Sequence, residues 1–142
     1  LIWDFQSSQR TSLSDFDIDV LYYQMDHQDE HQDVQYQEIL SQKLPNYQWS
    51  VKNQARMHLR NEDLPYQNTL HAIEHWPETA TAIIVRWNKN VGIELQCPFG
   101  LEDAFNLILR PTPHVRSKLH VFNQRILSKN WQKTWPGLKV EY

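Results

Sequence analysis

Hydrophobic and polar residues alternate strictly in "DFDIDV", and this pattern predicts a strand over residues 16–23. Successive side chains of a strand point to opposite faces, so one face of this strand carries three carboxylates. They belong to Asp15, Asp17 and Asp19. The unbroken apolar end "VLYY" favours a strand inside a sheet rather than at its edge.

The rest of the chain alternates between helical and extended patterns. Apolar spacing and helix-ending signals predict helices at residues 1–7, 36–44, 67–76, 100–109 and 115–126. Extended patterns predict further strands at residues 47–51, 81–87 and 91–96, the last two forming a hairpin across a short Asn-containing turn. No element is predicted for residues 53–66. This order predicts an α/β or α+β fold, with a mixed sheet of about four strands flanked by helices.

The length of 142 residues and the hydrophobic content of 40% fit one compact domain over residues 1–142. The chain starts with "LIWDF" rather than with methionine, and Leu1, Ile2 and Phe5 have helical spacing. We therefore expect the domain to be N-terminally incomplete, with its first helix beginning before Leu1.

Net charge and cysteine content exclude several classes of protein. A net charge of −3 argues against general DNA binding, because proteins of that class are usually basic. No apolar run approaches the roughly 18 residues of a membrane span, so no membrane partner is expected. The single cysteine, Cys97, leaves no internal disulfide and fits a reducing cytoplasm, where we expect the protein to act.

The three aspartates have two interpretations. Alternating polar residues are common on the solvated face of a strand. The alternative is a metal site, because Mg²⁺ takes hard oxygen ligands such as carboxylates. Residues two apart lie about 7 Å apart along a strand, so neighbouring carboxylates can converge on one ion or bridge two. Spacing alone does not choose between Asp15/Asp17 and Asp17/Asp19.

The predicted hairpin offers a third carboxylate. Glu94 lies on one face of the hairpin with Gly92 and Gln96. Six apolar residues share the other face: Ile83, Val85, Trp87, Val91, Ile93 and Leu95. Glu94 is the only acidic residue in either predicted hairpin strand. It is either an exposed strand glutamate or a further metal ligand.

Other candidate sites have weaker support. "HQDEH" (residues 27–31) matches a His-x-x-Glu-His zinc pattern, but it is very polar, follows a strand directly and has no evident third ligand. His71 and His75 are also four residues apart. Cys97 has no obvious base partner, so a cysteine nucleophile is not expected. Three tryptophans could stack on a base, although packing is the commoner role: Trp76, Trp131 and Trp135.

Several motifs resemble a known family. "DFDIDV" is similar to the acidic signature of the DNA polymerase β-like nucleotidyltransferase superfamily, and "GIELQ" is similar to its later strand with a third acid. Longer motifs resemble a bacterial family of nucleotidyltransferase-like proteins, and together they cover nearly the whole chain. These motifs are "WSVKNQARMH", "LPY", "HWPETATAI", "CPFGLEDAF" and "RPTP".

The resemblance implies a polymerase β-like fold and a metal-dependent reaction. It places the acidic pair at Asp17 and Asp19, leaves Asp15 as a flanking charge, and makes Glu94 the third ligand of Mg²⁺ or Mn²⁺. A nucleoside triphosphate would transfer its monophosphate to a hydroxyl of an unknown acceptor, which is an RNA, a protein or a small molecule. Pyrophosphate would be released.

Basic residues after the second predicted strand are candidates for the triphosphate. Lys52, Arg56 and Arg60 lie near the end of that strand, and Arg86 lies in the hairpin; each could instead be a solvated surface charge. Asn53, like its neighbour Gln54, could bind sugar or phosphate, or could close a turn. We take Lys52, Asn53 and Arg56 as the expected nucleotide contacts.

One feature departs from the superfamily. Its members carry a Gly-Ser or Gly-Gly turn at a helix start before the acidic strand, and backbone amides there hold phosphates. The three glycines of this chain, Gly92, Gly100 and Gly137, all follow the strand that carries Asp15, Asp17 and Asp19. The departure favours an alternative function, a catalytically inactive module of the same fold that binds a nucleotide or a protein.

Overall fold

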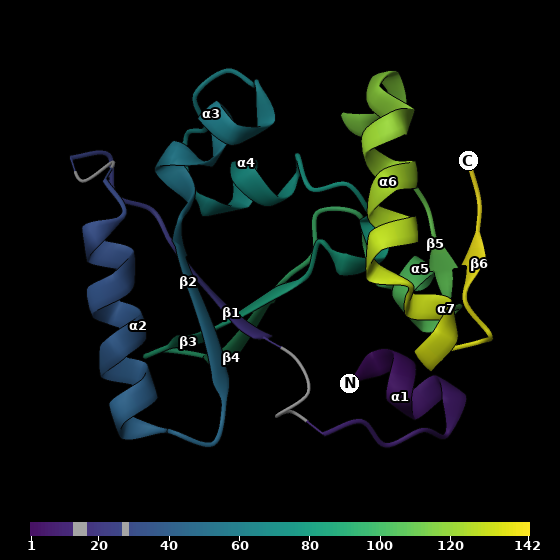
Figure 1. The fold of residues 1–142 in the computed structure, drawn as a ribbon, viewed down its shortest axis with the longest axis horizontal. Helices are drawn as coiled ribbons and strands as arrows, with labels where there is room; N and C mark the ends of the chain where they lie inside the picture. The colour runs from purple at the N-terminus through teal and green to yellow at the C-terminus, as the bar shows by residue number, and fades with distance from the viewer. Residues whose placement is uncertain (13–16, 27–28) are drawn as a thin grey trace. The chain divides into compact units, whose positions relative to one another are not determined.

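The computed structural model describes residues 1–12, 17–26 and 29–142 (Figure 1). Packing within the chain forms two compact units. One combines residues 1–10 with residues 73–142, and the other contains residues 11–72. We call them the discontinuous unit and the continuous unit. The single domain expected over residues 1–142 stays a prediction.

The continuous unit is built on two parallel strands joined by a helix. Strand β1 (Asp17–Tyr22) pairs with β2 (Gln48–Asn53), and α2 (His31–Lys43) connects them. The register runs from Asp17 opposite Gln48 to Tyr22 opposite Asn53. The predicted strands and helix are therefore present, with shifted ends; Phe16, at the start of the predicted first strand, lies outside the described residues.

Short helices follow β2, in and after the region without a predicted element. They are η2 (Gln54–Arg56), α3 (Met57–Asn61) and α4 (Thr69–Ile73). Helix α4 is shorter than the predicted helix at residues 67–76. It ends before His75, so His71 and His75 do not share a helix and the zinc spacing considered for them is absent.

Helix α2 covers one face of the two strands. The Tyr22 ring meets the Tyr36 ring edge-on at 5.3 Å between centroids, and the Trp49 indole donates to the Leu44 carbonyl at 3.1 Å. These contacts place Tyr22 and Trp49 on the helix side. Because side chains alternate along a strand, Asp17 and Asp19 point to the opposite face.

A buried ion pair joins α2 to the end of β2. The Asp33 carboxylate accepts hydrogen bonds from the Tyr22 hydroxyl at 2.6 Å, the Asn53 amide at 3.1 Å and the Arg56 guanidinium. Only 4% of the Asp33 side chain and 6% of the Arg56 side chain are exposed. Burial, followed by the bond to Asp33, raises the pKa of Tyr22 well above its usual value. The phenol therefore stays a donor, and Asp33 links β1, α2, β2 and η2.

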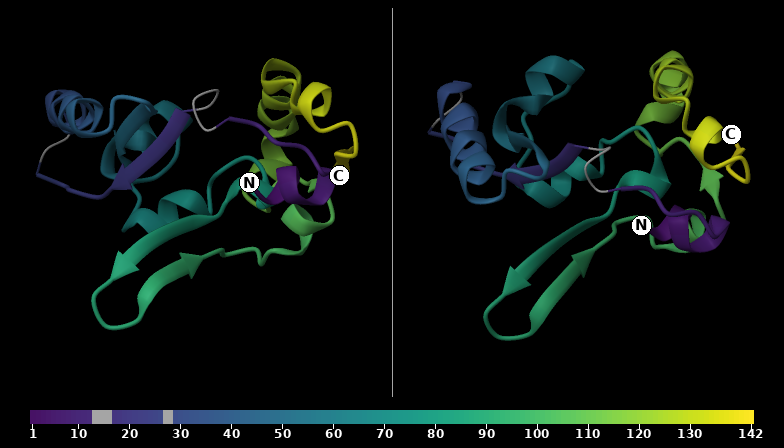
Figure 2. Two further views of the ribbon diagram at one scale, coloured as in Figure 1. Left: turned by 90° about the horizontal axis from the view of Figure 1, so that it is seen from below. Right: turned by 60° about the horizontal axis from the view of Figure 1, so that its bottom comes forward.

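The discontinuous unit contains a hairpin and several short helices (Figure 2). Strands β3 (Ile84–Asn88) and β4 (Gly92–Gln96) pair antiparallel, and β5 (Ile108–Leu109) pairs in parallel with β6 (Lys139–Val140). The helical segments are α1 (Ile2–Ser7), η3 (Thr79–Thr81), α5 (Glu102–Phe105), η4 (Val115–Lys118), α6 (Leu119–Lys129) and α7 (Trp131–Thr134).

Two details differ from the sequence-based prediction. The helix predicted at residues 100–109 ends at Phe105, because Leu107 has a left-handed backbone with φ 58°, and β5 follows. The four predicted strands are present, but the described strands pair as three two-stranded sheets, with β5 and β6 as an unpredicted pair. No described helix is long and apolar enough to cross a membrane.

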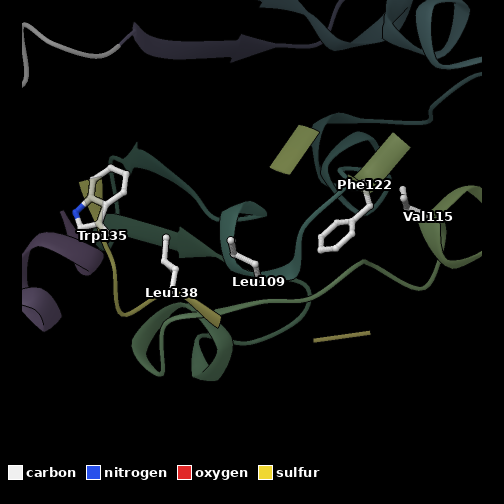
Figure 3. Packing of buried hydrophobic residues seen from close by; sticks show 5 residues of the cluster. All are labelled: Leu109, Val115, Phe122, Trp135 and Leu138. Atoms are coloured by element: carbon white, nitrogen blue, oxygen red, sulfur yellow. The ribbon is translucent and has the colours of Figure 1, made fainter. Parts of the chain in front are cut away.

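Figure 3 shows the core of the discontinuous unit, in which Leu109, Val115, Phe122, Trp135 and Leu138 are buried. Helix α1 joins this core through Trp3, whose ring meets those of Trp131 and Trp135 edge-on at 5.5 and 5.2 Å. The Trp135 indole also donates to Asp4 at 2.8 Å. Trp131 and Trp135 are therefore packing residues, the commoner of the two roles considered for them.

The discontinuous unit also contains a buried glutamate, Glu78. Glu78 has no exposed surface, and it accepts from the Arg125 guanidinium at 3.0 Å and the Thr81 hydroxyl at 2.8 Å. Burial raises the pKa of Glu78, and Arg125 offsets part of that effect.

The Asp33 network predicts a large stability effect. Asp33→Asn leaves Arg56 buried without its charge partner, so the free energy of unfolding should fall by about 3–5 kcal/mol in urea titrations. Glu38→Gln, at an exposed glutamate of the same helix, should change it by less than about 0.5 kcal/mol. Equal midpoints for the two variants would contradict the role assigned to Asp33.

Glu78 predicts a pH dependence of stability. Its folded pKa lies above the reference value of 4.5, so the folded protein binds this proton more tightly than the unfolded chain. The protonated Glu78 carboxyl therefore contributes to the free energy of unfolding. This contribution is complete below about pH 4.5 and is lost as the pH rises through the folded pKa. In thermal melts at a series of pH values, Glu78→Gln should lack this decline in stability. Glu102→Gln, at an exposed glutamate, is the control and should retain it. Parallel profiles for wild type and Glu78→Gln would refute the prediction.

Candidate functional site

The acidic face of β1 carries Asp17 and Asp19, both exposed and pointing away from α2. Their neighbours across the parallel pair are Gln48 and Ser50, and Lys52 follows on the same face of β2. Among the described residues, neither carboxylate has a cationic partner. Two hard oxygen donors with unbalanced charge fit a divalent cation. Asp15, the expected flanking charge, lies outside the described residues.

Glu94 lies on β4 of the discontinuous unit, directly opposite Arg86 in the hairpin register. The Arg86 guanidinium donates two bonds of 3.0 Å to its carboxylate. Asn88 donates a third bond at 2.9 Å, and Gln96 a fourth at 3.2 Å. The bonds from Asn88 and then Arg86 lower the pKa of Glu94. Glu94 is therefore a carboxylate already occupied by donors of its own hairpin, and binding a cation requires it to exchange at least one of them.

The hairpin separates polar and apolar side chains as its alternation predicts. Glu94 shares the polar face with Arg86, Asn88 and Gln96. The other face is apolar and exposed, as at Trp87 (74%) and Ile93 (76%). The third-ligand role of Glu94 beside Asp17 and Asp19 stays a prediction.

Asn53 closes the turn after β2. Its side-chain oxygen accepts from the amides of Gln24 and Ala55 at 3.0 and 3.1 Å, and its side-chain nitrogen donates to the Gln24 carbonyl at 2.8 Å. No part of Asn53 is exposed. These bonds match the turn-closing alternative, and a direct nucleotide contact by Asn53 stays a prediction.

Basic residues at the end of β2 and in the helices that follow it line a pocket of about 310 Å³ in the continuous unit. Its lining residues are Glu30, Lys52, Arg56, Met57, Leu59 and Arg60. Lys52 and Arg56, two of the expected nucleotide contacts, therefore share one pocket. The sequence did not identify Asp33 as the partner of Arg56. Its only signal was an acidic residue in the first turn of a helix, which helix termini commonly carry.

For two further candidates, Cys97 and the "HQDEH" segment, the described residues show no catalytic arrangement. Cys97 is a free, partly buried thiol. The "HQDEH" segment begins outside the described residues, and α2 starts only at its last histidine, His31.

The comparisons with known proteins agree with the motifs. A model of a nucleotidyltransferase family matches residues 1–140. An NMR structure described as revealing a CCA-adding enzyme head domain is similar to this chain, with a TM-score of 0.86 and 32% sequence identity. The match covers 99% of this chain and 75% of that chain. No curated protein sequence matches. The matches confirm the resemblance and the polymerase β-like α/β fold class.

The Glu94 contacts predict a measurable shift in its pKa. Asn88→Ala and Arg86→Gln each remove donors to the carboxylate, so each should raise the pKa of Glu94 toward its ordinary value. NMR titration of the glutamate side-chain carbons measures it. Lys89→Gln removes a positive charge from the hairpin turn but no bond to Glu94, and it serves as the control. An unchanged pKa in both test variants would contradict the described contacts.

Proposed function

Because the chain belongs to the nucleotidyltransferase family whose model spans residues 1–140, we propose that it transfers a nucleoside monophosphate from a nucleoside triphosphate to a hydroxyl acceptor. The acceptor oxygen forms a bond to the α-phosphorus, the bond from that phosphorus to the bridging oxygen breaks, and pyrophosphate leaves. The hydroxyl proton is released to solvent. The acidic face of β1 is the observation that carries this proposal.

Asp17 and Asp19 are the proposed metal ligands, with Glu94 as the third. The fit rests on the donor set, two exposed carboxylates on one strand face without a cationic partner in the described residues. Bound Mg²⁺ or Mn²⁺ would supply electrostatic stabilisation of the attacking and leaving oxygens. The carboxylates themselves concentrate divalent cations at this face and keep it acceptor-only, because an ionised carboxylate has no donor to offer a phosphate.

Lys52, Asn53 and Arg56 are the proposed nucleotide contacts. The Lys52 ammonium lies on the acidic face, two positions beyond the row of Asp19 and Ser50, or about 7 Å along the strand. That distance would let the ammonium neutralise phosphate oxygens without displacing a metal ion held by Asp17 and Asp19. Besides its proposed nucleotide contact, Asn53 fixes the turn that leads from Lys52 to Arg56. Positioning and charge stabilisation of this kind supply most of the catalysis in phosphoryl chemistry.

One comparison supports a choice of which acceptor to test first. The similar structure is described as a CCA-adding enzyme head domain, so an RNA 3′-hydroxyl is the first acceptor to test. Proteins and small hydroxyl compounds follow. A cytoplasmic location and the absence of a membrane partner remain expectations from the sequence.

The occupied state of Glu94 favours a second candidate function. A carboxylate held by Arg86, Asn88 and Gln96 is the arrangement expected of a structural glutamate. In that case the protein is a catalytically inactive module that binds a nucleotide or a protein partner. A Glu94→Gln variant that retains full transfer would remove Glu94 from the ligand set without touching the aspartates.

The proposal predicts loss of transfer in the acidic variants. With Mg²⁺ or Mn²⁺, each of the four α-labelled triphosphates and candidate acceptors, Asp17→Asn and Asp19→Asn should each reduce labelling by about 100-fold or more, or about 2.7 kcal/mol. Glu38→Gln, on the face of α2, is the matched control and should retain activity. In calorimetry, Mg²⁺ should likewise strengthen triphosphate binding over the metal-free level only where both aspartates are present. Equal labelling in wild type and the double variant would end the enzymatic proposal.

A further inference from the structure

Two histidines that the proposed reaction does not use lie side by side in the discontinuous unit. His75 belongs to the "HWPETATAI" motif, and His114 directly follows "RPTP". Their rings are 4.2 Å apart between centroids and are tilted by 57°. The zinc spacing considered for His75 pointed to His71, but the structure brings His114 beside it instead. We call His75 and His114 the histidine pair.

Backbone pairing brings the two histidines close to each other. The Thr112 amide donates to the Pro77 carbonyl at 3.0 Å, and an antiparallel bridge at Glu78 continues the pairing away from the histidines. His75 lies two residues before Pro77, and His114 lies two residues after Thr112. In an antiparallel arrangement, equal offsets from a bonded pair bring residues of the two segments together. The ring contact therefore follows from the register of the backbone.

The segments that carry the histidine pair are stiff. Thr112 has no exposed surface, and its hydroxyl donates to the Trp76 carbonyl at 2.7 Å. Proline fixes the backbone φ angle at three neighbouring positions, Pro77, Pro111 and Pro113. Ligands that are already ordered lose little conformational entropy when an ion binds. The histidine pair is thus held in place before any ion arrives.

The two rings offer nitrogen ligands at a separation that one ion can span. A ring nitrogen of each histidine lies within 4.8 Å of one from the other. Two imidazoles on one tetrahedral zinc ion, with bond lengths of about 2.0–2.1 Å, place their nitrogens about 3.3–3.4 Å apart. The two nitrogens therefore need to approach each other by at most about 1.5 Å, which small rotations of the side chains supply.

The chemistry of the ligands specifies the class of metal. Neutral imidazole suits Zn²⁺, Cu²⁺ and Ni²⁺, whereas Mg²⁺ prefers the oxygen ligands of carboxylates. Both histidines are half-buried, so an ion can reach the pair while part of the surrounding water is excluded. The histidine pair and the acidic face of β1 therefore differ in the metals that they select.

We propose that the histidine pair binds a transition-metal ion such as Zn²⁺. His75 and His114 supply two ligands, and water or another ligand completes the four-coordinate ion. The bound ion links residues 75–79 to residues 110–114 within the discontinuous unit, so it stabilises the folded protein over the unfolded chain. The site does not depend on the proposed transfer reaction, because neither histidine is a proposed ligand of its metal or its nucleotide.

The test titrates Zn²⁺ into the whole chain by calorimetry, with excess Mg²⁺ present to occupy the carboxylates. Wild type should show a binding event that His75→Gln and His114→Gln each weaken about tenfold or more, because each variant removes one ligand. His120→Gln, at an exposed histidine of α6, and Cys97→Ser, which removes the single thiol, are the controls and should bind as wild type does. Absence of binding to wild type, or equal binding by wild type and both pair variants, would overturn the proposal.

NMR of the wild-type protein identifies the ligands without relying on a variant. Substoichiometric Co²⁺ is paramagnetic and binds imidazole, so it should broaden the ring signals of His75 and His114 before that of His120. Equal broadening of all the histidine signals would mean adventitious binding only and would overturn the site.

Thermal melts distinguish a metal site from ring packing alone. Zn²⁺ should raise the melting temperature of wild type and should shift His75→Gln and His114→Gln far less, since an ion stabilises a protein only as far as it binds the folded state. Melts in chelator show whether each variant folds, and where one does not, the wild-type NMR decides. If Zn²⁺ shifts all three proteins equally, the two rings only pack against each other and the proposal fails.

Discussion

The buried contact between Asp33 and Arg56 determines much of the continuous unit. One carboxylate accepts donors from the last residue of β1, the last residue of β2 and the helical turn after it, so three segments are fixed relative to α2. Burying two charges is unfavourable unless each is well paired. Arg56 meets Asp33 through Nη2, and it is also one of the proposed nucleotide contacts. That proposed contact would make stability and binding depend on the same guanidinium.

The carboxylates of the proposed metal site, Asp17 and Asp19 on β1 and Glu94 on β4, have different surroundings. Asp17 and Asp19 stand on an exposed strand face with polar neighbours and no described cation, so their charge is available to a metal. Glu94 is neutralised across its hairpin by a residue directly opposite it in register. As the proposed third ligand, Glu94 would bind a metal only in competition with Arg86. That competition would couple metal binding to the contacts within the hairpin.

Local patterns predicted much of the fold, and long-range contacts account for most of what they missed. Alternation identified β1 and the hairpin, whereas the choice of Asp17 and Asp19 as the acidic pair came from the family resemblance and not from spacing. The bond between Asp33 and Arg56 joins residues 23 apart in the chain. The periodicity of hydrophobic residues in the sequence therefore gives no indication of it. The early end of α5 depends on one left-handed residue, Leu107, which is not a typical residue for that conformation. The Arg86–Glu94 pair, in contrast, follows from hairpin register alone.

The hydrogen bond between Trp135 and Asp4 has a consequence for the order of folding during synthesis. The discontinuous unit needs residues from both ends of the chain, and its core includes Trp135 and Leu138. It therefore cannot be completed until the residues through Leu138 have left the ribosome. The continuous unit has all of its residues available much earlier. Domains generally fold as units from the N-terminus during synthesis, so we expect the β1–α2–β2 segment to fold first. Helix α1 can pack only after Trp135, its partner in the core, has been synthesised.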